Sequence, residues 1–133
     1  MLRIFIICFG LLAMTAQSEA QDVPIQATIT AQIEAFRVDD FERAYSFASP
    51  TIHQIFGPTE RFAAMVMTGY PMVVNPARVE MMDLREVAGT LWQRVRITDQ
   101  KGQGWLLDYQ MVEGPLGWLI NAVQLQKAPD LGA

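Results

Sequence analysis

Few side chains in this sequence have types that could carry out chemistry. His53 is the only histidine, and an imidazole titrates near neutral pH, so it could act as a general base. Asp108 could take that role instead, with Tyr45 or Tyr109 as a hydrogen-bond donor into a pocket. Each residue also has a structural interpretation, because His53 flanks an apolar stripe and tyrosines commonly fill cores with their hydroxyl bonded. The sequence therefore offers isolated candidates for a small lyase, isomerase or hydrolase, without a complete catalytic set.

A second polar group lies on two neighbouring predicted strands. Arg94 and Arg96 share one face of the first strand, and Asp108 and Gln110 share one face of the next. In a hairpin these side chains become cross-strand neighbours. On a concave face, Arg94, Asp108 and Gln110 would form the polar floor of a ligand pocket, together with the two tyrosines. On a convex face they would form a solvated ion pair worth under about 1 kcal/mol, which is the interpretation we favour.

Other site types find no support in the sequence. A metal site needs several ligands at suitable spacing, and the chain has one histidine and one cysteine, Cys8. The segment Gly102-Gln103-Gly104 is too short to form a phosphate-binding loop. Asp39-Asp40 is better explained as a helix cap than as a carboxylate pair, since neighbours on a helix point about 100° apart. We therefore expect no metal and no cofactor.

The first twenty residues have the features of a secretory signal peptide. Arg3 supplies a positive charge, Ile4–Met14 is apolar, and Ser18 and Ala20 are small residues at the positions that a signal peptidase recognises. The apolar run is well short of the roughly 20 residues that span a membrane. We expect cleavage after Ala20, a periplasmic or secreted protein, and no membrane span in the mature chain.

The mature chain has the size of one domain, predicted to span residues 21–127, with a frayed tail at 128–133. Because Cys8 would be removed with the signal peptide, no disulfide can form, and the core must hold the domain together. The net charge is −4, and it is unchanged by cleavage because Arg3 and Glu19 cancel. Basic residues form no run, so a nucleic-acid partner is not expected.

The first half of the domain predicts three or four short helices. Apolar residues recur at spacings of three and four, and Pro24 suits a first-turn position. This first helix should close at Arg37-Val38, and Asp39-Asp40 should cap the second. Ser49-Pro50 either ends the second helix or begins a further short one. The apolar stripes are Ile25, Ile29, Ile33 and Phe36, then Phe41, Ala44, Tyr45 and Ala48, and finally Phe62, Met65 and Val66.

The last helix connects the two halves of the domain. We expect Thr59 to cap it and Gly69 to end it in a left-handed conformation. Tyr70-Pro71 should then turn the chain, and Met72–Val74 should be extended.

The second half predicts an antiparallel meander of four strands: Arg78–Val87, Thr90–Thr98, Gly104–Val112 and Trp118–Gln126. Both faces of the last two strands are partly apolar. One face should pack on the helices, and the other should line a pocket or contact a second chain, as in a homodimer. The predicted class is α+β, with N-terminal short helices packed on a C-terminal four-stranded antiparallel meander, cone-like in shape.

Several blocks of sequence, in order, resemble the bacterial domain-of-unknown-function family 4864. The blocks are Ala35–Phe41, Ala48–Ile52, Ile55–Gly57, Phe62–Val66, Gly69–Val73, Asp108–Val112 and Gly117-Trp118. The resemblance covers about Ile25 to Gln126 and implies a small exported or cell-envelope protein, with no catalytic residues to carry over. The order of helices and then a meander is also similar to the nuclear transport factor 2-like cones, which often enclose an apolar pocket.

Taken together, these features favour a non-enzymatic exported domain. It would bind a small apolar ligand or a protein partner through a cavity or an open sheet face. A cone-type enzyme that uses Asp108 or His53, and a homodimer without any ligand, are the alternatives.

Overall fold

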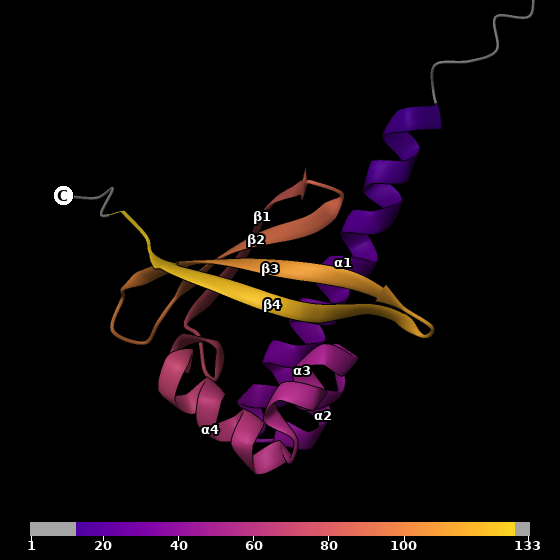
Figure 1. Ribbon diagram of the computed structural model, residues 1–133. Coiled ribbons are helices and arrows are strands. Elements are labelled where there is room, and N and C mark those ends of the chain that lie inside the picture. Colours follow the sequence, from indigo (N-terminus) through magenta and orange to yellow (C-terminus); the bar gives the residue numbers. More distant parts are fainter. Residues whose placement is uncertain (1–12, 130–133) are drawn as a thin grey trace, which may run out of the picture.

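The computed structural model describes the backbone of residues 13–129 and the side chains of residues 21–129. Within this range, four α-helices and one 3₁₀ turn precede a four-stranded antiparallel sheet. The shorter helices gather on one side of the sheet, and the long first helix runs along the same side and beyond it (Figure 1). The predicted α+β class and its order of layers are therefore confirmed.

Helix α1 (Ala13–Arg37) supplies one side of the core. Its predicted apolar stripe is buried, from Ile25 and Ile29 to Phe36. Pro24, however, lies inside the helix rather than in its first turn, because the helix begins at Ala13. The predicted cleavage point after Ala20 falls within this helix, and residues 1–12 of the predicted signal peptide lie outside the described range.

Three short helices follow: α2 (Phe41–Ser46), α3 (Pro50–Phe56) and α4 (Thr59–Gly69). A side chain caps the N-terminus of the first two. The Asp40 carboxylate accepts the N–H of Arg43 at the start of α2. The Ser49 hydroxyl accepts the N–H of Ile52 at the start of α3, so Ser49-Pro50 begins a further helix. Both caps satisfy N–H groups that have no partner within the first helical turn.

The predicted limits of α4 are wrong at both ends. Thr59 is already helical, Pro58 is the N-cap, and no described side chain caps this helix. Gly69 lies in the last turn without a positive φ, and Tyr70 is the C-cap. The left-handed glycine ends α3 instead, where Gly57 has a φ of 71°.

The segment after α4 was predicted to be extended, and this prediction is wrong. It forms the 3₁₀ turn η1 (Pro71–Val73) instead. Pro71 favours this outcome, because its ring fixes φ near the helical value and its missing N–H is not needed in a first turn. The N–H of Val73 donates to the Tyr70 carbonyl, which closes the turn.

The sheet follows the predicted meander, with strands β1 (Arg78–Val87), β2 (Thr90–Thr98), β3 (Gly104–Gly114) and β4 (Gly117–Lys127) in spatial order. The last two strands are slightly longer than predicted. The register shifts at two points, between Met81 and Leu84 in β1 and between Gln110 and Met111 in β3. Such bulges bend a strand and redirect side chains.

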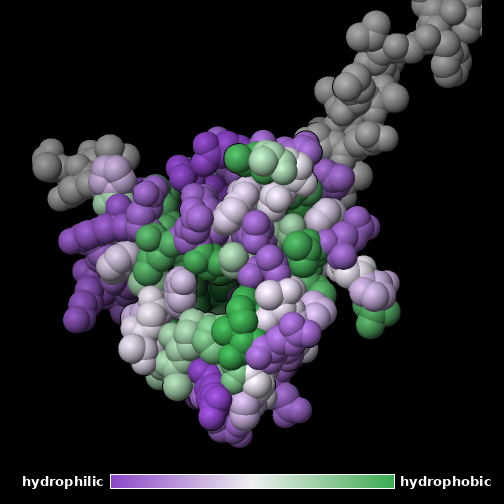
Figure 2. All heavy atoms as spheres, viewed as in Figure 1, coloured by the Kyte–Doolittle hydropathy of each residue, from purple (hydrophilic) through white to green (hydrophobic). Residues whose placement is uncertain are grey.

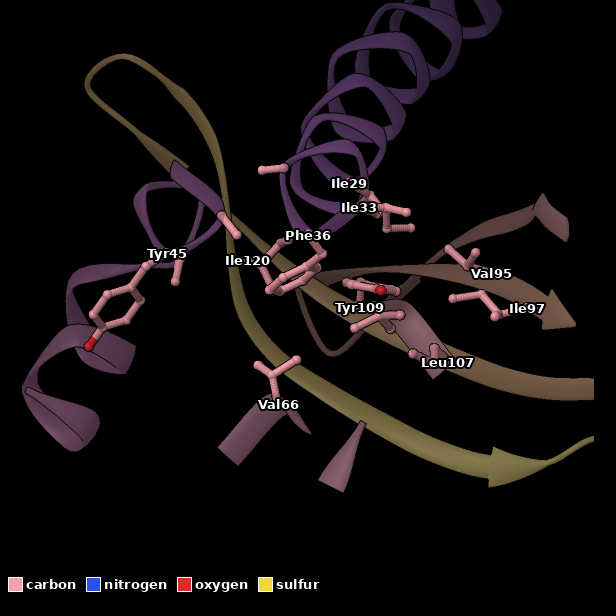
Figure 3. Close-up of a cluster of buried hydrophobic side chains, with 14 of the residues drawn as sticks. Ile29, Ile33, Phe36, Tyr45, Val66, Val95, Ile97, Leu107, Tyr109 and Ile120 are labelled. Atoms are coloured by element: carbon pink, nitrogen blue, oxygen red, sulfur yellow. The ribbon is translucent and has the colours of Figure 1, made fainter. Parts of the chain in front are cut away.

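The core lies between α1, α4 and the face of the sheet that carries the odd-numbered residues of β2 and β3. Val95, Ile97, Leu107 and Tyr109 are almost completely buried there. Figure 3 shows these side chains directed toward the same cluster as Phe36. We call this face the inner face of the sheet and the opposite one the outer face.

A short backbone bridge joins the helical layer to the sheet. The N–H of Ile120 in β4 donates to the Phe47 carbonyl at 2.9 Å, and the N–H of Ser49 donates to the Ile120 carbonyl at 2.8 Å. At the other end of β4, Ala128 is buried and donates its N–H to the Gly104 carbonyl. Residues 130–133 of the predicted tail lie outside the described range.

Candidate functional site

A cavity of about 340 Å³ lies between the short helices and the inner face of the sheet. Figure 2 shows it as a hollow with hydrophobic surface around it, between the sheet and the helices below. Its lining is mainly apolar and comes from every layer of the fold. The lining residues are Gln32, Phe36, Ala48, Ile52, Ile55, Phe56, Phe62, Met65, Val66, Tyr70, Val73, Leu107, Tyr109, Ile120, Asn121, Ala122 and Val123.

Helices α3 and α4 form the outer wall of the cavity. Ile55 is 64% exposed although it is large and apolar, and it lines the cavity together with Phe56 and Met65. Helix α4 is held in place by Phe62, whose ring stacks on Tyr45 with centroids 4.3 Å apart. The wall is thus attached at its base and exposes apolar side chains at its rim.

The inner face of the sheet forms the floor. Leu107, Tyr109 and Val123 contribute from paired positions of β3 and β4. The bulge at Gln110 and Met111 leaves Asn121 between two paired residues of β4, and Asn121 also lines the cavity. A regular strand would alternate its side chains, so the bulge explains why neighbouring residues of β4 line one cavity.

Three of the four polar lining residues already have partners. Gln32 donates from Nε2 to the Ala44 carbonyl at 3.1 Å, and the Tyr70 hydroxyl donates to the Val123 carbonyl at 3.0 Å. Asn121 accepts from the Ser49 hydroxyl at 2.7 Å and donates to Gln110 Oε1 at 2.8 Å. These bonds hold the polar groups of the wall in fixed positions.

Tyr109 is the fourth polar lining residue and differs from the others. This residue is 1% exposed, and no hydrogen bond between its hydroxyl and another described residue is found, whereas Tyr45 and Tyr70 both donate to carbonyls. Burial, reinforced by nearby Tyr70, raises the pKa of Tyr109 above its usual value. At physiological pH its hydroxyl is therefore a neutral group that can both donate and accept.

Arg94 and Asp108 are brought together as predicted, but on the outer face and away from the cavity. They pair across β2 and β3. Arg94 Nε lies 2.9 Å from Asp108 Oδ1, and Nη2 lies 3.0 Å from Oδ2. The hydrogen bonds to Asp108 raise the pKa of Arg94. Both side chains are partly exposed, so the solvated ion pair is the interpretation that fits, and the pair does not form a pocket floor.

Gln110 also lies at an outer-face position and does not line the cavity, but it supports Asn121, which does. Its contribution to the cavity is therefore indirect, through the orientation of the Asn121 amide.

His53 and Tyr45 form a structural pair. Their rings stack with centroids 3.8 Å apart, and His53 Nε2 lies 2.9 Å from the Tyr45 carbonyl oxygen. The Tyr45 hydroxyl donates to the Gly57 carbonyl at 3.0 Å. Neither residue lines the cavity, and neither does Asp108. A general base must reach the substrate proton, so the geometry that an enzyme based on His53 or Asp108 requires is not met in this cavity.

Sequence reasoning did not find Gln32, Tyr70 or Asn121 as lining residues. The sequence pattern could have indicated Asn121, because it is a lone amide within the otherwise apolar start of the last strand. It could not have indicated Gln32, since a glutamine on a helix is ordinarily solvated.

Between residues 13 and 129, no helix has both the length and the apolar content needed to cross a membrane. In the same part of the chain, no three His, Cys, Asp or Glu side chains come together as a metal site.

Comparison with known proteins gives one match. The model of the family described as Domain of unknown function (DUF4864) matches residues 18–133. No curated protein and no solved structure matches the chain, and the resemblance to nuclear transport factor 2-like cones is therefore not confirmed.

Proposed function

The chain belongs to the family described as Domain of unknown function (DUF4864), and we propose that it binds a small apolar ligand in the cavity between its helices and its sheet. The observation that carries this proposal is the lining, in which the sheet, α3 and α4 all direct apolar side chains toward one open space. Ligand sites in proteins are typically apolar hollows with a few fixed polar groups.

The volume of the cavity limits the size of the ligand. It lies near the lower end of the roughly 300–1,000 Å³ seen for small-molecule sites. A methylene group occupies about as much space as a water molecule in the liquid, roughly 30 Å³, so the cavity encloses an apolar body on the order of ten carbons, and a larger ligand would extend past the exposed rim at Ile55. Burial of each methylene stabilises the complex by about 0.8 kcal/mol, which provides a sufficient driving force.

The test is binding of a neutral apolar fluorophore such as N-phenyl-1-naphthylamine. We expect its emission to increase on binding, and the melting temperature to rise by roughly 10 °C at a free concentration about 100 times the dissociation constant. The absence of binding across a panel of neutral apolar compounds of this size would contradict the proposal.

A matched pair of variants localises the binding to the cavity. Val66→Phe adds a ring to a buried lining residue of α4 and should abolish fluorophore binding. Met67→Phe adds a similar ring to the next residue, which is exposed and does not line the cavity, and should bind as the wild type does. Equal binding by both variants would place the fluorophore elsewhere.

We also propose that the protein is exported. The support is the pattern of the first twenty residues together with the position of the core, whose first described member is Ile25. Cleavage after Ala20 leaves this core intact. Mass spectrometry of the protein from a bacterial periplasm should give a chain that begins at Gln21, and a full-length chain in that fraction would argue against cleavage there.

A second candidate function is association through the outer face of the sheet. Trp92, Leu106, Val112 and Leu119 are only partly covered there. Such a surface fits a second copy of the chain or another protein. Sedimentation as a monomer at micromolar concentration would remove the homodimer.

A further inference from the structure

The described residues of the cavity lining carry no formal charge. Although 18% of the sequence is charged, none of the described residues that line the cavity is Asp, Glu, Lys, Arg or His. The rim formed by Ile55, Phe56 and Met65 is apolar as well. An ionised group that enters an apolar space without a partner loses its hydration and gains little in exchange. The lining therefore disfavours carboxylates and ammonium groups.

One polar group in the cavity nevertheless remains available. Tyr109 lines the cavity, and no hydrogen bond between its hydroxyl and another described residue is found. Figure 3 shows the ring beside Phe36 and Leu107, in apolar surroundings. The hydroxyl is therefore free to donate a hydrogen bond to a ligand oxygen in the cavity, and such a bond would stabilise the complex.

We propose that the ligand is an uncharged amphiphile, with an apolar body and one neutral oxygen that accepts a hydrogen bond from Tyr109, as in an alcohol, ketone, aldehyde or ester. This inference rests on the proposed apolar-ligand function and adds to it the exclusion of ionised lipids. It also gives Tyr109 the role of a specificity-determining residue.

The test compares three ligands with the same chain and different charge: 1-decanol, decanoate and decyltrimethylammonium. Each is titrated into the complex of the full-length protein with N-phenyl-1-naphthylamine at pH 7.5, below the solubility limit of decanol and the critical micelle concentrations of the two ions. We expect decanol to bind at least about tenfold more tightly than either ion. Equal or tighter binding of decanoate or of the ammonium ion would overturn the proposal.

Tyr109→Phe tests the hydrogen bond. It removes only the hydroxyl, which bonds to no described residue, so the fold should persist. Affinity for decanol should fall about three- to tenfold, while affinity for the fluorophore should stay unchanged. Tyr45→Phe is the control, because its hydroxyl bonds to Gly57 outside the cavity, and it should leave both affinities unchanged. An unchanged decanol affinity in Tyr109→Phe would overturn the role of Tyr109.

The two proposals fail in distinguishable ways. If neither the fluorophore nor decanol binds, the proposed function fails and this inference fails with it. If the fluorophore binds but decanol has no advantage over decanoate, the cavity binds apolar compounds without the selectivity proposed here, and only this inference fails.

Discussion

The ion pair between Arg94 and Asp108 is the clearest polar feature of the outer sheet face. Its two hydrogen bonds are well formed, but both side chains remain partly exposed. Water and salt screen such a pair, and exposed pairs usually contribute little to stability.

A double-mutant cycle with Arg94→Gln and Asp108→Asn should therefore give a coupling energy below about 1 kcal/mol. Urea denaturation of the four proteins measures it. A much larger coupling would mean that this face is covered in solution, which would favour a partner on the sheet.

Asp99 organises the turn between β2 and β3. Its Oδ1 accepts the N–H groups of Lys101 and Gln103, and its Oδ2 accepts the indole N–H of Trp105, each at 2.9 Å. The bond from Trp105 is the main cause of a lowered pKa for the Asp99 carboxyl. The ionised carboxylate thus stabilises the folded turn more than the neutral acid does.

The sign of the pH effect follows from this lowered pKa. The folded state holds the Asp99 proton more weakly than the unfolded state, where the pKa is about 3.9. Its stabilising contribution is therefore complete above about pH 4 and disappears as the pH falls through the lower folded value. The stability difference between wild type and Asp99→Asn, measured by urea denaturation, should shrink as the pH falls below about 4.

Glu113→Gln, at an exposed position of β3, controls for the change in net charge. A constant difference between wild type and Asp99→Asn across the acidic range would contradict the role given to the ionised carboxylate.

At the scale of elements, the ends of two helices show that a glycine at a helix end need not have a positive φ. Gly57 follows α3 directly, and Gly69 is the last residue of α4. Only Gly57 has a positive φ, and neither has a neighbour within 4 Å of the position that a Cβ would occupy. The two glycines therefore differ in backbone conformation and not in available space.

The matched substitutions should have opposite effects. Gly69→Ala should raise the free energy of unfolding, by up to about 0.5–1 kcal/mol, because alanine favours the helix. Gly57→Ala should lower it by roughly 1–3 kcal/mol, because a side chain strains this angle. Thermal and urea denaturation measure both, and destabilisation by Gly69→Ala would restore the left-handed cap that the structure does not show.

The strands illustrate the opposite case, in which local pattern sufficed. Alternation in Thr90–Thr98 and the turn residues on either side predicted β2 with its observed bounds. Neighbouring strands joined by short turns can form only a few arrangements, so the meander followed. The bulge that exposes Asn121 to the cavity could not be predicted, because the pairing of β3 with β4 and contact with Phe47–Ser49 decide it.

At the scale of the whole molecule, the described core begins at Ile25, after the predicted signal peptide. Ile25 and Ile29 are completely buried, whereas Val23 is 72% exposed. In a chain that starts at Gln21, Pro24 would lie in the first turn of α1, where proline is tolerated.

A protein that spans residues 21–133 should therefore unfold within about 1 kcal/mol of the full-length chain. Urea denaturation of both proteins checks this expectation. A large loss of stability would show that the first twenty residues belong to the folded domain.

The sequence by itself determined the α+β class, the helix stripes, the four strands and the Arg94–Asp108 pairing. Each depends on spacing along the chain or on one turn, which local residue types specify. Only the tertiary structure decided which sheet face the helices cover, and therefore that Arg94 and Asp108 lie outside the cavity while Tyr109 lies inside it. Both faces of β3 carry apolar residues, so alternation alone could not choose between them. Tertiary packing selects the buried face, because α1 and α4 cover the face whose side chains fill the space between these helices and the sheet.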